Sequence, residues 1–323
     1  MVQHSGSRPR RADAMSQSQP GHRSAADWSL FALLTLLWAA AYALTRVAVD
    51  KGNPELGLPV AWVLPGRLTI GAAVLWVFML ARGQRLPSLK DRKRWLAILG
   101  MGLAGSVFPF FLITTAQETV NSSLAALYTA AVPIFVVCGA SFLFADERMT
   151  RGTAIGVLSG FAGVAVLFGP DAMNGLGSAS VIAQGLLILA TMNYAAASLM
   201  ARGAPRMEAI PFATGFVTLA AIVSWPLAFT VNPAEVTADW THWAAVAGLG
   251  VIPTAIAQAL YMLLIARTSA TFLSLTGYSI PVVSAGLGWL FFRETQSWHA
   301  LIAFALILGG VWLARRGGGV KEG

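Results

Sequence analysis

The sequence predicts an all-α polytopic membrane protein whose ten transmembrane helices form two inverted five-helix repeats. Composition is the first observation behind this prediction: mean hydropathy is +0.67, and 11% of the 323 residues are charged, against roughly 25% in a soluble domain. The second is a series of apolar stretches near the roughly 20 residues that a transmembrane helix needs. The third is a pattern that occurs twice, over residues 124–150 and 272–297.

Each occurrence of this pattern has a tyrosine shortly before a proline in an apolar helix, and an acidic residue where the apolar run stops. The first set is Tyr128, Pro133 and Asp146-Glu147, and the second is Tyr278, Pro281 and Glu294. Aligning the prolines, which lie 148 residues apart, places Glu294 on Asp146. Matched proline-interrupted segments in the two halves of a membrane chain are typical of a transporter's binding site.

Composition along the chain sets the expected domains. Residues 1–26 are polar and basic, which predicts a disordered cytoplasmic tail and not a signal peptide. We expect a first five-helix repeat over 27–170, a second, inverted repeat over 171–316, and a short cytoplasmic tail over 317–323. The ten spans are expected at residues 28–49, 60–81, 95–116, 122–144, 152–168, 179–200, 210–230, 242–266, 270–292 and 298–314.

The distribution of Lys and Arg predicts the orientation. With ten spans and a cytoplasmic N-terminus, the cytoplasmic tails and loops hold eighteen of these residues and the outer loops hold two, Lys51 and Arg293. Cytoplasmic loops are enriched in Lys and Arg, so both termini are expected inside. The same bias accounts for the net charge of +8 without a nucleic-acid partner. A five-span unit that is repeated once must insert in the opposite sense, which makes the repeats inverted.

Four short motifs follow one another along the chain: Trp38-Ala-Ala-Ala-Tyr42, Gly66-Arg67-Leu68, Pro133 through Asp146-Glu147-Arg148-Met149-Thr150, and Pro281 through Phe292-Arg293-Glu294. With these motifs the chain resembles the drug/metabolite transporter superfamily in its ten-span, EamA-type form. The resemblance implies carrier-mediated movement of small metabolites, often export of amino acids, and the aromatic amino-acid exporter branch is our preferred analogue. Two features depart from the family pattern: Ala39 stands where Gly is usual, and the acid of the second repeat is shifted by one position.

Candidate substrate-binding residues are aromatic and polar side chains within or bordering the spans. They are Trp38, Tyr42, Arg67, Gln117, Tyr128, Asn193, Tyr194, Gln258, Tyr261 and Tyr278. Tyr42 with Tyr194, and Tyr128 with Tyr278, are approximate repeat partners that inverted copies would bring toward the midplane. A phenol offers an aromatic face and one hydroxyl, which suits a cavity for amphipathic or aromatic solutes. The interfacial belt is the alternative place for a membrane tyrosine.

Arg67 lies deeper in its predicted span than Arg46, roughly 10 Å from the outer boundary. A charge at that depth costs about 1–3 kcal/mol unless it faces water or a partner. We therefore expect Arg67 to face the cavity and attract a substrate carboxylate, and Arg46 to snorkel to the interface. Pro133 and Pro281 each remove a backbone donor and are expected to be hinges, with kinks required only by packing as the alternative.

Acidic residues lie at the ends of the predicted spans and not near their middles: Asp50, Glu118, Asp146, Glu147 and Glu294. Proton-driven carriers usually need a carboxylate or a His relay within the membrane, so we expect facilitated diffusion or exchange. We expect Asp146-Glu147 and Glu294 to cap the helix that follows each of them, because carboxylates suit a helix N-terminus. Gating is the alternative role.

Small residues mark the fifth and tenth spans. Gly156, Gly160 and Gly163 form a stripe on the fifth, and Gly309-Gly310 lie in the tenth. Such stripes allow helices to approach closely. A dimer face and packing within one subunit are equally compatible with them.

We therefore expect a multi-pass transporter of the cell (inner) membrane that exports amino acids, aromatic or other neutral, by facilitative alternating access through a midplane cavity. Drug or toxic-compound efflux and nucleotide-sugar exchange are alternatives on the same fold, and an intramembrane enzyme or a receptor is a remote one. An enzyme would need a nucleophile with a His, paired carboxylates or a metal set inside the bilayer, and the spans supply none of these. We expect no cofactor and no metal; the expected partners are a small-molecule substrate and the lipid bilayer, and a homodimer is possible.

Overall fold

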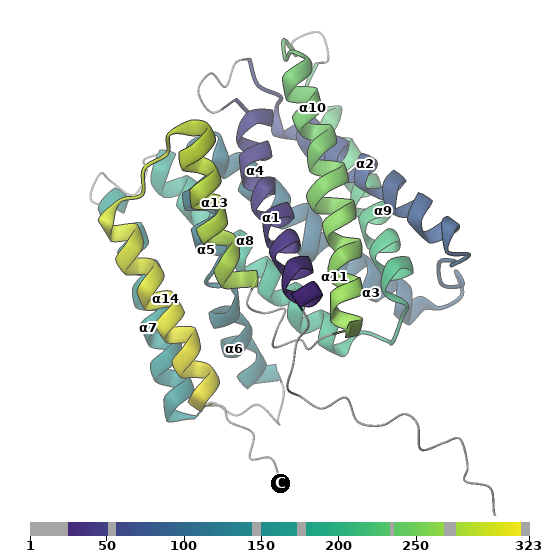
Figure 1. The fold of residues 1–323 in the computed structure, drawn as a ribbon. Coiled ribbons are helices and arrows are strands. Elements are labelled where there is room, and N and C mark those ends of the chain that lie inside the picture. Colours follow the sequence, from purple (N-terminus) through teal and green to yellow (C-terminus); the bar gives the residue numbers. More distant parts are fainter. Residues whose placement is uncertain are drawn as a thin grey trace, which may run out of the picture.

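The computed structural model describes residues 25–50, 56–143, 150–172, 179–232, 236–267 and 276–317. Regular structure within these ranges is entirely helical (Figure 1). Among the described residues, seven segments are long and apolar enough to cross a membrane, and three further apolar helices are shorter. These segments fall where the sequence predicts its ten spans, so the chain is an all-α polytopic membrane protein.

Seven of the spans are single helices in the described residues: α1 (Ala25–Ala48), α2 (Val60–Ala81), α7 (Arg151–Ala172), α8 (Ala179–Gly203), α9 (Ala209–Ala228), α13 (Thr276–Phe292) and α14 (Trp298–Gly317). The other three are interrupted. The third comprises α3 (Arg92–Gly102), η1 (Leu103–Val107) and α4 (Phe108–Gln117); the fourth comprises α5 (Ser122–Thr129) and α6 (Val132–Leu143); the eighth comprises α10 (Trp240–Leu249), η3 (Gly250–Ile256) and α11 (Ala257–Arg267).

The interruptions of the third and eighth spans are π-helical and lie at matched positions. The segment η1 begins at Leu103 and η3 begins at Gly250, 147 residues later. A proline accompanies each: Pro109 lies at the start of α4, and Pro253 lies inside η3. Proline has no N–H to close an α-helical turn, and short π-helical segments occur often at functional sites. The two repeats therefore share a π-helical segment at matched positions, which hydropathy alone does not predict.

The fourth span shows a break beside Pro133. A turn at Ala130 and Ala131 separates α5 from α6, and Pro133 stands in the first turn of α6. Its repeat partner Pro281 lies inside the continuous helix α13 and is buried. The two prolines thus have different local structures, and their role as hinges stays a prediction. Residues 144–149, which include Asp146 and Glu147, lie outside the described residues.

The packing of the spans has the symmetry of two equivalent repeats. The second span packs on the seventh (α2 on α9), and the fifth packs on the tenth (α7 on α14). The first span packs on the ninth (α1 on α13), and its counterpart, the sixth, packs on the fourth (α8 on α6). The third packs on the sixth (α4 on α8), and the eighth packs on the first (α10 and α11 on α1). Exchanging the repeats leaves this pattern unchanged.

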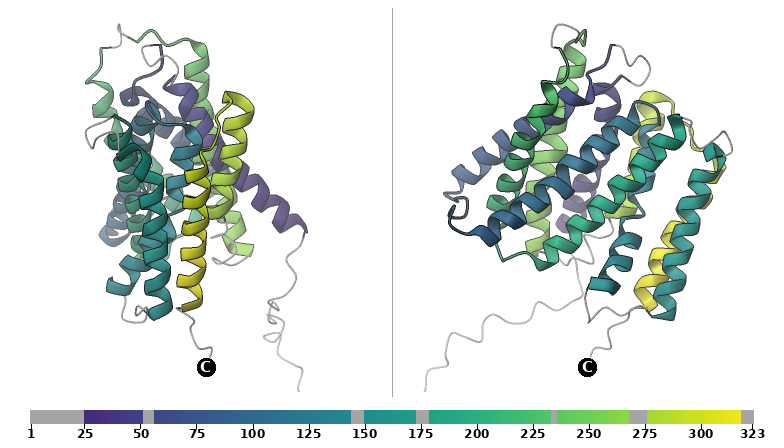
Figure 2. Two further views of the ribbon diagram at one scale, coloured as in Figure 1. Left: turned by 90° about the vertical axis from the view of Figure 1, so that its left-hand side faces the viewer. Right: turned by 180° about the vertical axis from the view of Figure 1, so that it is seen from behind.

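The paired spans run in opposite directions, as inverted repeats require. Along α2 and α9, Thr69 bonds to Trp225, whereas Trp76 bonds to Thr218. The pair α7 and α14 also runs antiparallel at one edge of the bundle (Figure 2). The packing pattern and these directions together relate the repeats by a pseudo-two-fold axis in the membrane plane.

The glycine stripe joins α7 to α14 within one subunit. A Cβ at Gly310 would lie 2.5 Å from the carbonyl oxygen of Gly156 and 2.6 Å from the backbone nitrogen of Gly160. A Cβ at Gly163 would lie 2.8 Å from the carbonyl oxygen of Ala303. Only glycine permits backbones to approach this closely. Of the two roles expected for the stripe, the structure shows packing within the subunit.

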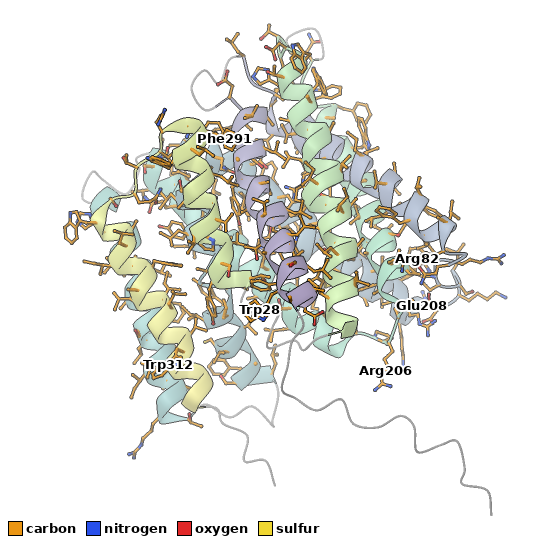
Figure 3. The ribbon with its side chains drawn as sticks, in the orientation of Figure 1. Trp28, Arg82, Arg206, Glu208, Phe291 and Trp312 are labelled. Carbon is orange, nitrogen blue, oxygen red and sulfur yellow. The ribbon has the colours of Figure 1, made fainter. Side chains whose placement is uncertain are left out.

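Apolar and charged side chains occupy different parts of the surface. Val77 and Leu158 are about two-thirds exposed along the sides of the bundle, where lipid tails suit them. Charged side chains gather instead beyond the spans: Arg82, at the end of α2, lies near Arg206 and Glu208, just before α9 (Figure 3). The surface thus has the polarity of a membrane-embedded bundle.

Candidate functional site

Arg67 lies buried between three spans. It is 7% exposed within α2, and its Nε donates a hydrogen bond to the Thr254 hydroxyl of η3, with 2.9 Å between the two atoms. The central carbon of its guanidinium lies 3.6 Å from the ring centroid of Phe110 in α4. This distance is short enough for a cation–π interaction. The cation that the sequence places deep in the second span therefore contacts both spans that carry a π-helical segment.

Local chemistry explains why η3 presents a hydroxyl here. In a regular α-helix the carbonyl of Leu249 would accept from the N–H of residue 253, but Pro253 has none. The segment is π-helical, so its backbone bonds run from residue i to i+5, and the Thr254 hydroxyl also donates to the Leu249 carbonyl, at 2.8 Å. A hydroxyl has one proton to donate and two lone pairs, so its oxygen stays available to accept from Arg67.

Two glycines bring α2 and η3 close enough for this contact. A Cβ at Gly71 would lie 2.6 Å from the Thr254 methyl group. A Cβ at Gly250 would lie 2.6 Å from Cβ of Ile70 and 2.9 Å from the carbonyl oxygen of Arg67. Larger residues at either position would push the helices apart and lengthen the bond from Arg67 to Thr254.

Tyr42 and Tyr194 complete the surroundings of Arg67. Both phenols are near enough to its guanidinium for electrostatic coupling. The Tyr42 hydroxyl donates to the Thr129 hydroxyl at 3.1 Å, and Gln117 Nε2 donates to the Tyr42 carbonyl at 2.9 Å. Of the predicted site residues, the structure thus brings together Tyr42, Arg67, Gln117 and Tyr194. We call these four with Phe110, Thr129 and Thr254 the Arg67 site.

The remaining predicted residues lie in other surroundings. Trp38 packs against Tyr261 with the rings tilted by 42° and 5.4 Å between their centroids. Tyr128 is 1% exposed and its hydroxyl donates to Gln184, which places it in the core between the fourth and sixth spans, where Tyr278 also packs. The last two are half-buried: Asn193 donates to the Leu189 carbonyl of its own helix at 2.9 Å, and Gln258 lies in α11.

Sequence reasoning missed three members of the Arg67 site, Phe110, Thr129 and Thr254. Phe110 carries no polar signal, and a hydroxyl within a span, such as that of Thr129 or Thr254, is most simply explained by hydrogen bonding between helices, as both residues show. One available signal was the adjacency of Pro253 and Thr254, because a hydroxyl next to an in-span proline can bond to the carbonyl that the proline frees. The partner across 187 residues was not predictable from that signal.

A second polar cluster joins three spans at the end of the bundle opposite the start of α1. Glu294, just beyond α13, forms an ion pair with Arg46 near the end of α1. It also accepts hydrogen bonds from the backbone N–H groups of Ser122 and Ser123, both at 3.1 Å, and from both hydroxyls. These serines begin α5. We call these residues the Glu294 network.

The Glu294 network corrects two expectations. Glu294 caps α5 and not the following helix α14, whose first turn is capped by Ser297 through the N–H of Ala300 at 3.2 Å. Arg46 does not snorkel alone, because it is paired with Glu294 and its guanidinium carbon lies 4.6 Å from the ring centroid of Phe292. The carboxylate therefore links the first repeat to the second.

Opposing effects act on the Glu294 carboxyl. Burial raises its pKa, whereas the hydrogen bonds from Ser123 and Ser122 lower it, and the net pKa lies below the ordinary glutamate value. Glu294 is therefore ionised at neutral pH. An ionised, 5% exposed carboxylate with this many donors makes a strong connection between helix ends.

Two inverted five-span units around a buried cation define the class of protein, a membrane transporter. Comparison with protein families gives the family. The EamA-like transporter family matches residues 28–169 and again residues 181–316, and the chain belongs to this family. It is a transporter and not an enzyme.

Relatives across most of the chain carry transporter names. The chain is 27% identical over 288 residues to the uncharacterized inner membrane transporter YedA of Escherichia coli, covering 87% of this chain and 89% of that protein. It is 27% identical over 301 residues to a probable terminal-alkyne amino-acid exporter of Streptantibioticus cattleyicolor, covering 91% and 94%. It is 30% identical over 252 residues to the aromatic amino acid exporter YddG of Ancylobacter novellus, covering 76% and 84%. A crystal structure that is 26% identical matches with a TM-score of 0.61, covering 87% of this chain and 98% of that one.

Proposed function

We propose that this transporter exports neutral amino acids, aromatic ones among them, across the cell membrane, with both termini in the cytoplasm. The Arg67 site is the observation that carries the proposal. The Arg67 guanidinium is buried among spans of both repeats. Among the described residues it makes one hydrogen bond, through Nε. The two terminal nitrogens form the edge that binds a carboxylate with two parallel hydrogen bonds.

The surroundings of Arg67 favour a zwitterionic solute with an apolar side chain. Phe110 supplies an aromatic surface beside the cation, and the phenols of Tyr42 and Tyr194 lie within electrostatic range of it, which suits a ligand that is both aromatic and polar. Acidic residues lie only at span ends, so a substrate ammonium would bind neutral acceptors such as phenol oxygens. A single cation suits one carboxylate better than the phosphates of a nucleotide sugar. The names of two relatives as amino-acid exporters agree with this reading.

We propose alternating access as the mechanism, without ion coupling. The Glu294 network ties together the ends of α1 and α13 and the start of α5, so it holds that end of the bundle closed. With both termini in the cytoplasm this end would face outward, and the network would close the bundle to the outside. Bending of the fourth and ninth spans near Pro133 and Pro281 would then open one side as the other closes.

Counterflow in proteoliposomes tests the function. Vesicles loaded with unlabelled L-phenylalanine should accumulate labelled L-phenylalanine without a pH gradient, and leucine should compete better than lysine. Efflux of cationic dyes or exchange of nucleotide sugars without amino-acid counterflow would contradict the proposal. A requirement for a pH gradient would overturn the facilitative mode alone.

The role of Arg67 is tested by Arg67→Gln. Hydrogen bonds to charged groups contribute about 1.5–3 kcal/mol each, so losing the carboxylate contact should raise the half-saturation concentration roughly 10- to 100-fold. Arg82→Gln is the matched control, because Arg82 is the exposed arginine at the end of the same helix. Equal behaviour of the two variants would remove Arg67 from the binding site.

A further inference from the structure

We infer that Thr254 is a positioning residue that aims the Arg67 guanidinium at the substrate carboxylate. The inference rests on the proposed role of Arg67. It adds a residue on the other repeat, 187 positions away along the chain, whose hydroxyl fixes which edge of the guanidinium is offered to the ligand.

The direction of the hydrogen bonds is settled by proton counting. The Thr254 hydroxyl spends its one proton on the Leu249 carbonyl at 2.8 Å, so toward Arg67 it acts only as an acceptor. The Nε–H of Arg67 is a donor in every state of the residue. The 2.9 Å contact between them therefore has a fixed polarity. The carbonyl that orders the hydroxyl has no α-helical partner, because residue 253 is proline.

Two contacts together fix the guanidinium plane. Thr254 holds the Nε edge, and the Phe110 ring lies 3.6 Å from the central carbon on one face. A guanidinium held at one edge and one face keeps its outer pair of nitrogens in one direction. Bidentate binding of a carboxylate depends on that direction, and a point charge on a freely rotating side chain would not supply it.

Within the part of the chain that the structure describes, this arrangement has no equivalent at the matched positions of the other repeat. With the 147-residue offset between η1 and η3, the counterpart of Thr254 is Val107, which has no hydroxyl. The counterpart of Arg67 is Thr214, a buried residue whose hydroxyl donates to the Ile210 carbonyl of its own helix at 2.9 Å. The proposed site therefore offers one carboxylate-binding edge, held through a second-repeat residue on η3.

Variants of Thr254 separate positioning from structural support. Thr254→Val removes the hydroxyl at nearly constant volume, and Thr254→Ser keeps it. Thr218→Val is the matched control, since Thr218 also joins two spans through its hydroxyl, accepting from Trp76 Nε1 at 3.0 Å and donating to the Thr214 carbonyl at 2.6 Å. Each variant is assayed by L-phenylalanine counterflow, with 3-phenylpropionate (carboxylate only) and phenethylamine (ammonium only) as competitors.

Thr254→Val should raise the half-saturation concentration for L-phenylalanine roughly tenfold, the effect of one hydrogen bond to a charged group, with the maximal rate within about twofold. Competition by 3-phenylpropionate should weaken by a similar factor, and competition by phenethylamine should not change. Thr254→Ser should restore both values to within about threefold of the parent protein. Thr218→Val should lower the amount of folded protein without changing the ratio of the two competitors.

The possible failures are distinguishable. If Arg67→Gln abolishes competition by 3-phenylpropionate while Thr254→Val does not weaken it, Thr254 is not a positioning residue and the proposed function stands. If Thr254→Val only lowers the amount of folded protein, as Thr218→Val does, its role is structural and the inference is wrong. If Arg67→Gln leaves that competition intact, or the parent protein carries no amino acid, the proposed site falls and this inference falls with it.

Discussion

Replacing Glu294 with glutamine should open the end of the bundle where the Glu294 network joins α1, α5 and α13. The variant keeps the shape of the side chain but loses the charge that pairs with Arg46. Each carboxylate oxygen also accepts from one serine N–H, at Ser122 or Ser123. Glutamine has one acceptor oxygen, so its NH₂ group must face a backbone N–H that cannot rotate away.

The size of the effect follows from what the substitution breaks. Removing one partner of a buried ion pair costs about 3–5 kcal/mol, and losing a helix cap costs about 1 kcal/mol. Since Arg46 is 19% exposed, water solvates its charge and offsets part of this cost. We therefore expect the substitution to destabilise the closed state by about 3 kcal/mol. That is on the order of 100-fold in the equilibrium, enough to bring a state populated at about 1% to near parity.

Double electron–electron resonance between two spin labels measures this shift toward the open state directly. Spin labels at Thr119 and Thr295, which are exposed and lie beside α4 and α13, report the separation of the third and ninth spans at this end. Glu294→Gln should add a long-distance population comparable to the short one. Asp91→Asn is the control, because Asp91 also caps a helix and pairs with an arginine, Arg94, but within one span. An unchanged distribution in Glu294→Gln would refute the reasoning.

Three further predictions follow from particular contacts. The folded-state pKa of Glu294 lies below its ordinary value, so its stabilisation of the helix ends is complete at neutral pH and is lost only as the pH falls through that lowered pKa. The distance distribution between the labels at positions 119 and 295 should therefore be the same from pH 6 to 8, and opening within that range would contradict this prediction. Gly310→Leu should lower the midpoint temperature of thermal unfolding by several degrees, because a Cβ there has no room between α7 and α14. Gly309→Leu should not lower it, because no atom lies within 4 Å of a Cβ at that position. Pro133→Ala with Pro281→Ala should slow counterflow more than it lowers the amount of folded protein, and equal activity per folded molecule would dismiss these prolines as hinges.

Hydropathy and the repeated pattern were sufficient to predict the spans and their inverted relation, because both depend on residue types along the chain. Arg67 was also predictable, since a charge within an apolar stretch needs a partner or a polar cavity. The interruptions of the spans were less accessible. Pro253 marked the eighth span, but the π-helical segment η1 starts at Leu103, several residues before its proline.

Contacts between distant spans explain the rest of what the sequence left open. Phe110 and Thr254 join the Arg67 site through the rotational setting of α4 and η3 about their axes, which no local pattern specifies. The cap on α5 comes from Glu294, 172 residues away, whereas a carboxylate next to a helix start in sequence was the natural expectation. Tyr128 and Tyr278 pack in the same apolar cluster as Tyr42 and Tyr194, and their role in substrate binding stays a prediction, because pairing along the chain does not say which face of a helix a substrate meets.

The most direct test of the account is the accessibility of one cysteine from both sides of the membrane. Thr129 bonds to Tyr42 within the Arg67 site, and Cys138 is the single native cysteine, so Thr129→Cys in a Cys138→Ala background reports on the site alone. An impermeant thiol reagent should reach this cysteine only from the cytoplasmic side, and adding Glu294→Gln should make it reachable from the outside while slowing the cytoplasmic reaction. Simultaneous, independent labelling from both sides in either protein would show a continuous pore and contradict alternating access between two inverted repeats.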